Sequence, residues 1–171
     1  MLFFGFFWGF FHVSLSPDIS LGIIWPPIGI IYIEPLDIPL FNTMLLLLSG
    51  FSLTWVHKVI TTNDVKNAID GSIITICLGL FFLILQIMEY YESYFSFNDS
   101  VYGSVFFMLT GLHGFHVFVG VTFIAICFIR YLNKHFTPSH HIGFLFAIWY
   151  WHFVDIVWIF LYLTLYLWSL F

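Results

Sequence analysis

Long stretches without a charged side chain constrain this chain more than any other feature of its sequence. No Asp, Glu, Lys or Arg occurs between Asp37 and Lys58, and none occurs between Asp99 and Arg130. Each stretch is long enough to cross a bilayer, which takes roughly 20 residues in a helix. The stretches are too continuous for the alternating strands of a membrane barrel, and only helices and closed barrels satisfy their backbone in lipid. The sequence therefore predicts an all-α, polytopic transmembrane helix bundle.

The composition excludes several other classes of protein. Charged residues make up 8% of the 171 residues, against about 25% in a soluble domain, which excludes a water-soluble globule and a disordered chain. Four Lys and Arg against nine Asp and Glu give a formal net charge of -5, which argues against nucleic acid as a partner. The two cysteines, Cys77 and Cys127, lie in apolar runs and offer no disulfide framework or cysteine-based zinc site.

We expect residues 1–171 to form a single transmembrane helical domain with five segments, at about 2–15, 40–60, 68–91, 101–131 and 142–170. The first segment is truncated, because its roughly 14 residues rise only ~21 Å, short of a ~30 Å hydrocarbon core. It looks like the end of a helix whose beginning lies elsewhere. We therefore expect a separate chain to supply the missing N-terminal helices and to dock against residues 1–11. An unrelated subunit or a thinned bilayer is the alternative.

The basic residues all lie near two of the predicted loops. Lys58 and Lys66 flank the link between the second and third segments, and Arg130 and Lys134 flank the link between the fourth and fifth. The other side, with the proline-rich loop at residues 16–39, carries acidic residues and no basic one. By the positive-inside rule, the basic loops face the cytoplasm or the mitochondrial matrix.

Eight histidines raise the question of a metal site. His113 and His116 are three residues apart and therefore share a helix face. They could ligate a metal ion or a haem, but hydrogen bonding between helices is the favoured interpretation. Asp155 lies near the middle of an apolar run, so its side chain must be neutral or paired within the protein. A structural contact with His152, one turn earlier, is favoured over a proton relay.

A basic group at the membrane surface is a further candidate site, and it consists of Arg130, Lys134, His140 and His141. Such groups bind the headgroups of anionic phospholipids. The same charges also set the orientation of a membrane protein, and the two interpretations are equally supported at this point. No residue is assigned a catalytic, cofactor-binding or metal-ligating role.

Several short motifs follow one another along nearly the whole chain. They are Gly5-Phe6-Phe7-Trp8 with His12, Trp25-Pro26-Pro27 with Gly29, Pro39-Leu40 with Asn42-Thr43, Ser49-Gly50, Thr54-Trp55, Glu89-Tyr90-Tyr91-Glu92, Tyr102-Gly103-Ser104, Gly111-Leu112-His113-Gly114-Phe115-His116-Val117 and Trp149-Tyr150-Trp151-His152-Phe153-Val154-Asp155. In this order they resemble subunit III of the haem–copper cytochrome c oxidases, in its mitochondrial form.

The resemblance implies a seven-helix subunit of which this chain matches the last five helices. It implies no haem or copper here, since those cofactors lie in partner subunits, and it implies packing on subunit I among the other complex IV subunits. It further implies a bound phospholipid near Arg130 and His140, and support of proton uptake and of lasting activity. The chain departs from the family at Leu145, where a glutamate is common, and a second glutamate of the family falls before Met1.

We therefore expect a non-redox, structural and lipid-binding subunit of a proton-pumping oxidase that passes electrons from cytochrome c to oxygen. The resemblance implies a multi-pass protein of the mitochondrial inner membrane, with its basic loops in the matrix. The proline-rich loop and the C-terminus then lie in the intermembrane space. A subunit of a quinol-oxidising relative is the nearest alternative, and a self-contained His-rich membrane metalloenzyme is an alternative of another class.

Overall fold

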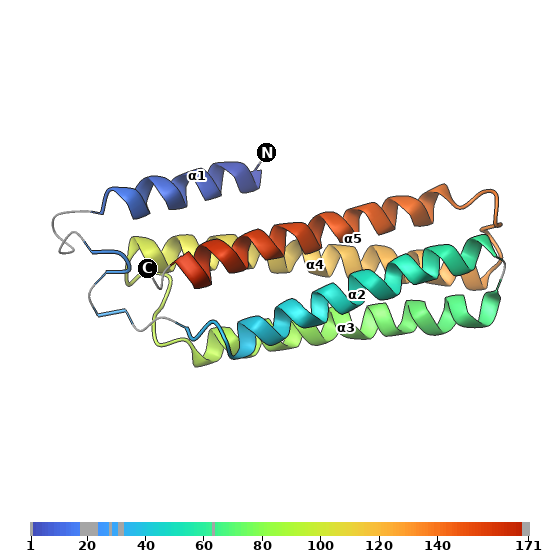
Figure 1. Ribbon diagram of the computed structural model, residues 1–171, viewed down its shortest axis with the longest axis horizontal. Coiled ribbons are helices and arrows are strands. Elements are labelled where there is room, and N and C mark those ends of the chain that lie inside the picture. Colours follow the sequence, from blue (N-terminus) through green and yellow to red (C-terminus); the bar gives the residue numbers. More distant parts are fainter. Residues whose placement is uncertain (1, 18–23, 28, 31–32, 63, 169–171) are drawn as a thin grey trace.

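Helices make up nearly all of the ordered secondary structure of this protein. The computed structural model describes residues 2–17, 24–27, 29–30, 33–62 and 64–168, and the described residues contain no strand. The helices, shown in Figure 1, are α1 (Leu2–Leu15), α2 (Ile38–Thr61), α3 (Val65–Glu92), α4 (Val101–Leu132) and α5 (Ile142–Leu161), and α5 continues as a π-helical segment, η2 (Tyr162–Leu167).

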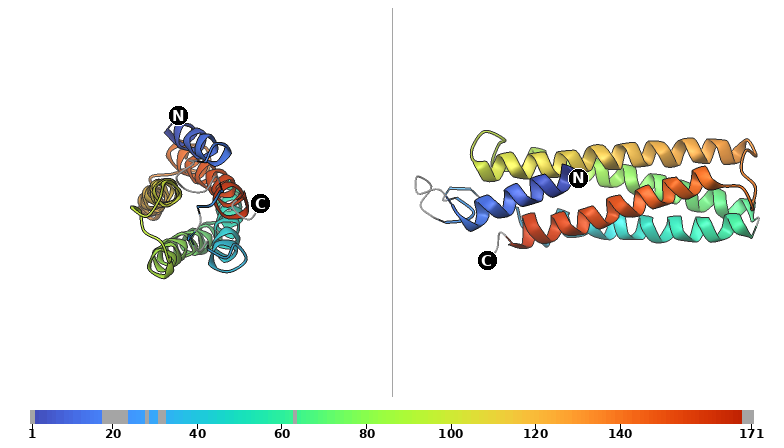
Figure 2. Two further views of the ribbon diagram at one scale, coloured as in Figure 1. Left: turned by 90° about the vertical axis from the view of Figure 1, so that its left-hand side faces the viewer. Right: turned by 90° about the horizontal axis from the view of Figure 1, so that it is seen from above.

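Four of these elements are long and apolar enough to cross a membrane: α2, α3, α4, and α5 together with η2. They run antiparallel along the long axis of the molecule, and each packs against two of the others (Figures 1 and 2). The shorter α1 lies outside this ring, against α4 and α5. The expected class, an all-α polytopic bundle, is confirmed.

The helix ends differ slightly from the expected ones, for local reasons. α2 begins at Ile38 rather than at residue 40, with Pro39 in its first turn, where the missing N–H of proline costs no hydrogen bond. α3 begins at Val65 rather than at residue 68, because the side chain of Asp64 caps it and accepts a hydrogen bond from the backbone N–H of Asn67 at 3.3 Å. Residues 169–170 of the expected last segment lie outside the described residues.

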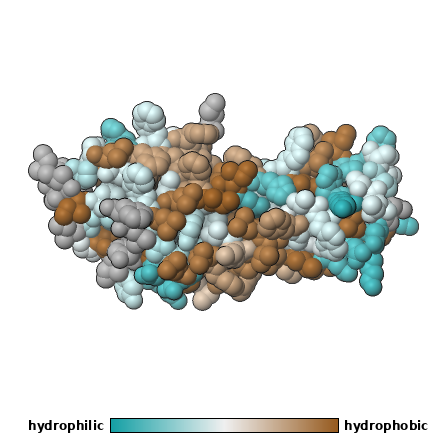
Figure 3. Space-filling model, viewed as in Figure 1, coloured by the Kyte–Doolittle hydropathy of each residue, from teal (hydrophilic) through white to brown (hydrophobic). Residues whose placement is uncertain are grey.

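The surface of the bundle and the contacts between its helices are both typical of a protein in a lipid bilayer. Apolar side chains cover the middle of the face shown in Figure 3, and hydrophilic ones gather at the end that carries the α2–α3 and α4–α5 loops. Lipid tails are as apolar as leucine, so helices in a bilayer are held together by close packing and by hydrogen bonds. Two such bonds join α5 to α2, from the Trp151 indole to Ser49 (2.9 Å) and from the Trp158 indole to Thr43 (3.0 Å).

Two glycines allow the Trp151 ring to lie between helices. A Cβ atom at Gly79 of α3 would come within 2.8 Å of the ring, and a Cβ atom at Gly120 of α4 would also come within 2.8 Å of it. Real side-chain atoms do not approach one another so closely, so both positions require the absence of a side chain. The indole is fully buried as a result.

We predict that Gly120→Ala destabilises the bundle by about 1–3 kcal/mol, the usual cost of overpacking a buried contact. The measurement is the free energy of unfolding of the purified protein in detergent micelles. Gly114→Ala is the matched control, because it lies on the same helix and its Cβ atom would meet no described atom within 4 Å. Equal losses in the two variants would show that the Trp151 contact is not the cause.

Candidate functional site

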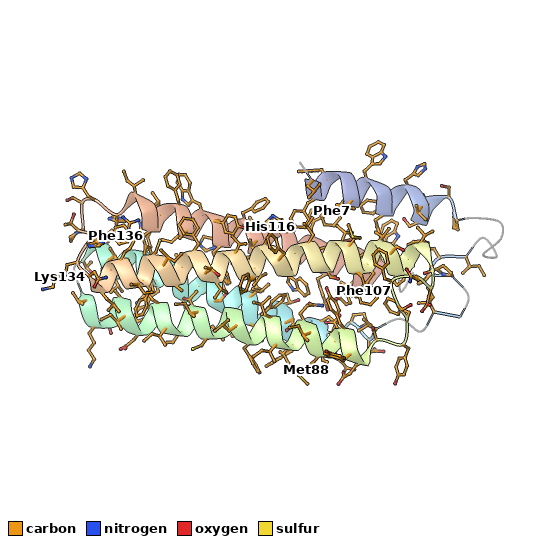
Figure 4. All side chains as sticks on the ribbon, turned by 180° about the vertical axis from the view of Figure 1, so that it is seen from behind. Phe7, Met88, Phe107, His116, Lys134 and Phe136 are labelled. Atoms are coloured by element: carbon orange, nitrogen blue, oxygen red, sulfur yellow. The ribbon has the colours of Figure 1, made fainter. Side chains whose placement is uncertain are left out.

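The basic end of the bundle begins at the last turn of α4. Arg130 lies in this turn, and its guanidinium lies over the Phe136 ring, with 4.8 Å from Cζ to the ring centroid. Phe136 packs edge-on against Phe144 of α5, at 6.3 Å between ring centroids. The Phe136 ring, in the α4–α5 loop, thus holds the Arg130 guanidinium beside the beginning of α5. Figure 4 shows Phe136 and Lys134 together at this end.

Lys134 occupies an unusual backbone position just after α4. The N–H of Lys134 donates to the carbonyl of Tyr131 (2.9 Å), and the N–H of His135 donates to the carbonyl of Arg130 (3.0 Å). This pair of bonds is the Schellman arrangement, which usually has glycine at the position of Lys134 because φ is positive there. Lys134 has a φ of 59°, so a residue other than glycine closes this helix end, and its side chain is exposed.

The two histidines of the candidate site are held by a tight turn before α5. The backbone N–H of His140 lies 3.1 Å from both the carbonyl and the hydroxyl of Thr137. The ring of His141 lies 5.5 Å from that of His57 on α2. Arg130, Lys134, His140 and His141 therefore all lie at the end of the bundle that carries the α4–α5 loop.

The carboxylates of the other loops lie at the opposite end. Glu34 and Asp37 precede α2, Glu92 ends α3, and Asp99 precedes α4; Asp18 lies outside the described residues. The backbone N–H of Ser96 donates to Oδ2 of Asp99 at 2.6 Å and holds the pKa of that exposed carboxyl below its ordinary value. These four carboxylates thus lie a full bundle length from the basic residues, whereas Asp64, which caps α3, lies at the basic end.

His113 and His116 contact different helices although they share a face of α4. The ring of His113 is fully buried, with Nε2 3.3 Å from the carbonyl oxygen of Val154 on α5. The ring of His116 turns towards α1 (Figure 4), where its centroid lies 5.2 Å from that of Phe3. Its Nδ1 lies 2.7 Å from the carbonyl oxygen of Leu112, within the same helix. Of these two histidines, only His113 therefore has a hydrogen-bonding contact with another helix through its ring.

Asp155 lies between α5 and α2 at the middle of the bundle. Its Oδ2 atom is 3.7 Å from Nδ1 of His152, which is longer than a hydrogen bond. A Cβ atom at Gly50 would lie 2.5 Å from the same oxygen, so the carboxyl needs a glycine on α2. Thr54, also on α2, lies 3.2 Å from Nε2 of His152. The pair expected from the sequence is in reality a four-residue contact between two helices.

One further buried acid, Glu89, was not among the candidate site residues predicted from the sequence. Glu89 of α3 is only 2% exposed, and its Oε1 accepts a hydrogen bond from the Tyr166 hydroxyl of η2 at 2.5 Å. Glu89 follows the buried Phe82 and Gln86 on the same helix face, and this spacing was the available signal. Among the described residues, no three His, Cys, Asp or Glu side chains converge as ligands for a metal ion.

Comparison with known proteins identifies relatives along almost the whole chain. The family model of cytochrome c oxidase subunit III matches residues 1–170. The chain is 53% identical to cytochrome c oxidase subunit 3 of Drosophila melanogaster over 99% of its own length and 64% of that protein. It is 52% identical to the protein of the same name from Loxodonta africana over 99% of its length and 65% of that protein. For the protein of Equus caballus the identity is 54%, over 96% of this chain and 63% of the relative.

The chain thus spans a little under two thirds of the length of these relatives. The match extends from α1 to the end of α5 and includes every motif that carried the resemblance. With its membrane-spanning helices, it confirms the family predicted from the sequence. The chain belongs to the cytochrome c oxidase subunit III family.

Proposed function

We propose that this chain works as a non-redox, structural and lipid-binding subunit of cytochrome c oxidase in the mitochondrial inner membrane. The observation that carries the proposal is the identity of 53% over 99% of the chain to a cytochrome c oxidase subunit 3. The chain acts as one transmembrane helical domain packed against subunit I. Electrons pass from cytochrome c to oxygen through haem and copper in the partner subunits, and this chain supports proton uptake and the stability of the catalytic subunit.

The contacts of the intramembrane polar residues support a structural role for them. His113 reaches the α5 backbone, and His152 and Asp155 meet α2 at Thr54 and Gly50. His116 is used within its own helix and against α1. Polar contacts of this kind stabilise helix pairs in membranes. These side chains therefore hold the bundle together, and no chemical step is assigned to them.

The basic end supports the lipid-binding part of the proposal. Arg130 and Lys134 carry permanent charge, and His140 and His141 add hydrogen-bonding ring nitrogens beside them. Among the described residues, no carboxylate lies within ion-pair distance of these four side chains. An anionic phospholipid headgroup at the surface of the bilayer meets both requirements, negative charge and hydrogen-bond acceptors.

We predict that Arg130→Gln weakens the binding of an anionic phospholipid about fivefold, since one basic side chain near a headgroup contributes ~1 kcal/mol. Native mass spectrometry of the complex, titrated with phosphatidylglycerol, measures the bound lipid. Lys66→Gln is the control, because it removes the same charge from the first turn of α3, next to the other basic loop. Unchanged retention in the Arg130 variant would remove this lipid site.

We predict that the α4–α5 loop faces the matrix and the α3–α4 loop faces the intermembrane space. The test places single cysteines at Ser139 and Asn98 and treats intact mitoplasts with a maleimide that does not cross membranes. Asn98→Cys should be labelled directly, and Ser139→Cys should be labelled only after lysis. The native Cys77 and Cys127 lie within α3 and α4 and provide the background in the unsubstituted protein. The opposite labelling pattern would reverse the orientation.

The proposed function as a whole is tested on complexes prepared with and without this chain. We predict unchanged haem spectra and similar initial oxygen consumption with cytochrome c, followed by faster loss of activity during turnover when the chain is missing. Oxidation of a quinol instead of cytochrome c would support the quinol-oxidase alternative. Stoichiometric metal in the isolated chain would contradict the non-redox assignment.

A further inference from the structure

A pocket with mainly aromatic walls opens where the chain passes from α3 to α4, at the end of the bundle opposite the basic residues. Its volume is about 480 Å³. The aromatic residues that line it are Tyr90, Tyr94, Phe95, Phe97 and Phe107. Of its other lining residues, only Asp99 has an ionisable side chain. The pocket therefore combines several aromatic rings with one carboxylate.

The rings form a connected wall, with an inner and an outer part. Phe107 of α4 packs edge-on against Tyr90 of α3, at 5.2 Å between ring centroids, and Phe95 of the loop lies 5.6 Å from Phe107. Tyr94 and Phe97, also in the loop, form the outer part and are 81% and 47% exposed. A ligand in this pocket therefore meets ring surface both at its mouth and further inside.

Asp99 brings a negative charge that no basic side chain of the protein balances. The backbone N–H of Ser96 donates to its Oδ2 at 2.6 Å and holds the pKa of this carboxyl below its ordinary value, so it is ionised at neutral pH. Asp99 forms no ion pair with any described residue, and all four Lys and Arg residues lie at the opposite end of the bundle. The pocket therefore attracts a ligand that carries its own positive charge.

The level of the pocket in the membrane indicates which kind of ligand reaches it. α3 and α4 are both long and apolar enough to cross a membrane, so the loop between them lies at the surface of the bilayer. Phe107 lies six residues after Val101, where α4 begins, which is about 9 Å along the helix. Figure 4 shows Phe107 towards this end of the bundle and Lys134 at the other. The pocket thus extends from the level of the lipid headgroups towards the hydrocarbon.

We propose that this pocket binds the choline headgroup of a phosphatidylcholine. The faces of aromatic rings carry negative charge and attract cations, and a quaternary ammonium group is typically recognised by several rings together. The Asp99 carboxylate in the same wall adds its attraction for the cation. The acyl chains of the lipid continue into the bilayer. This site differs from the proposed anionic-lipid site near Arg130 both in position and in the sign of its charge.

The experiment titrates the complex with phosphatidylcholine in an uncharged detergent and measures the bound lipid by native mass spectrometry. We expect Tyr94→Leu to weaken binding about threefold, since leucine is apolar but has no ring face, whereas Tyr94→Phe should retain it. Asp99→Asn should weaken binding about fivefold, the effect of one unit charge at close distance in water. Asparagine keeps an oxygen that accepts the Ser96 hydrogen bond. Phosphatidylglycerol, which has no cationic group, should not be weakened by any of these changes.

Glu92→Gln is the matched control, because it removes a carboxylate from the same end of the bundle but lines the neighbouring pocket and not this one. It should leave phosphatidylcholine binding unchanged. Arg130→Gln should leave it unchanged too, so this proposal and the anionic-lipid site at the other end succeed or fail independently.

Three results would overturn the proposal. Equal losses in Glu92→Gln and Asp99→Asn would mean diffuse attraction to an acidic surface. Unchanged phosphatidylcholine binding in Tyr94→Leu would mean that the rings do not hold the headgroup. Loss of a protein subunit, and not of lipid, from the Tyr94→Leu and Asp99→Asn complexes would mean that the pocket holds a cationic segment of a partner chain.

Discussion

The arrangement of the bundle depends on the contacts that the Trp151 ring makes with the other long helices. The ring belongs to α5, donates a hydrogen bond to Ser49 of α2, and packs against Gly79 of α3 and Gly120 of α4. One side chain thus contacts all three of the other long helices. In lipid, where apolar surface gains little by leaving the solvent, such close packing and the indole hydrogen bond supply the attraction between helices. A second tryptophan of α5, Trp158, likewise donates a hydrogen bond to Thr43 of α2.

The separation of charge along the bundle follows from the same solvent. Charged side chains are costly inside a bilayer and collect at its two surfaces. Here all four basic residues are at one end, near Arg130, and the described carboxylates of the loops are at the other, near Glu92, except for Asp64, which caps α3 at the basic end. The two ends consequently attract ligands of opposite charge, and a single subunit offers one kind of surface chemistry to each side of the membrane.

The fold was largely predictable from the sequence, whereas the contacts of the polar residues were not. The absence of charge between Asp99 and Arg130 was enough to identify α4, because lipid imposes helices on such stretches. Helical spacing placed His113 and His116 on one face, but it did not show that one would reach α5 and the other α1. Gly50 became meaningful only beside Asp155. These contacts depend on how neighbouring helices are rotated relative to one another, and a single sequence does not specify that rotation.

The π-helical end of α5 has a consequence for how such a sequence can change. Tyr162 donates a hydrogen bond to the carbonyl of Pro35 (3.2 Å), and four residues later Tyr166 donates one to Glu89. Both hydroxyls must point inward, towards partners fixed on two other segments. Insertion or loss of one residue in α5 would rotate this end by about 100° and remove both bonds at once. Descendants of this sequence can therefore exchange side chains along α5 far more freely than they can alter its length.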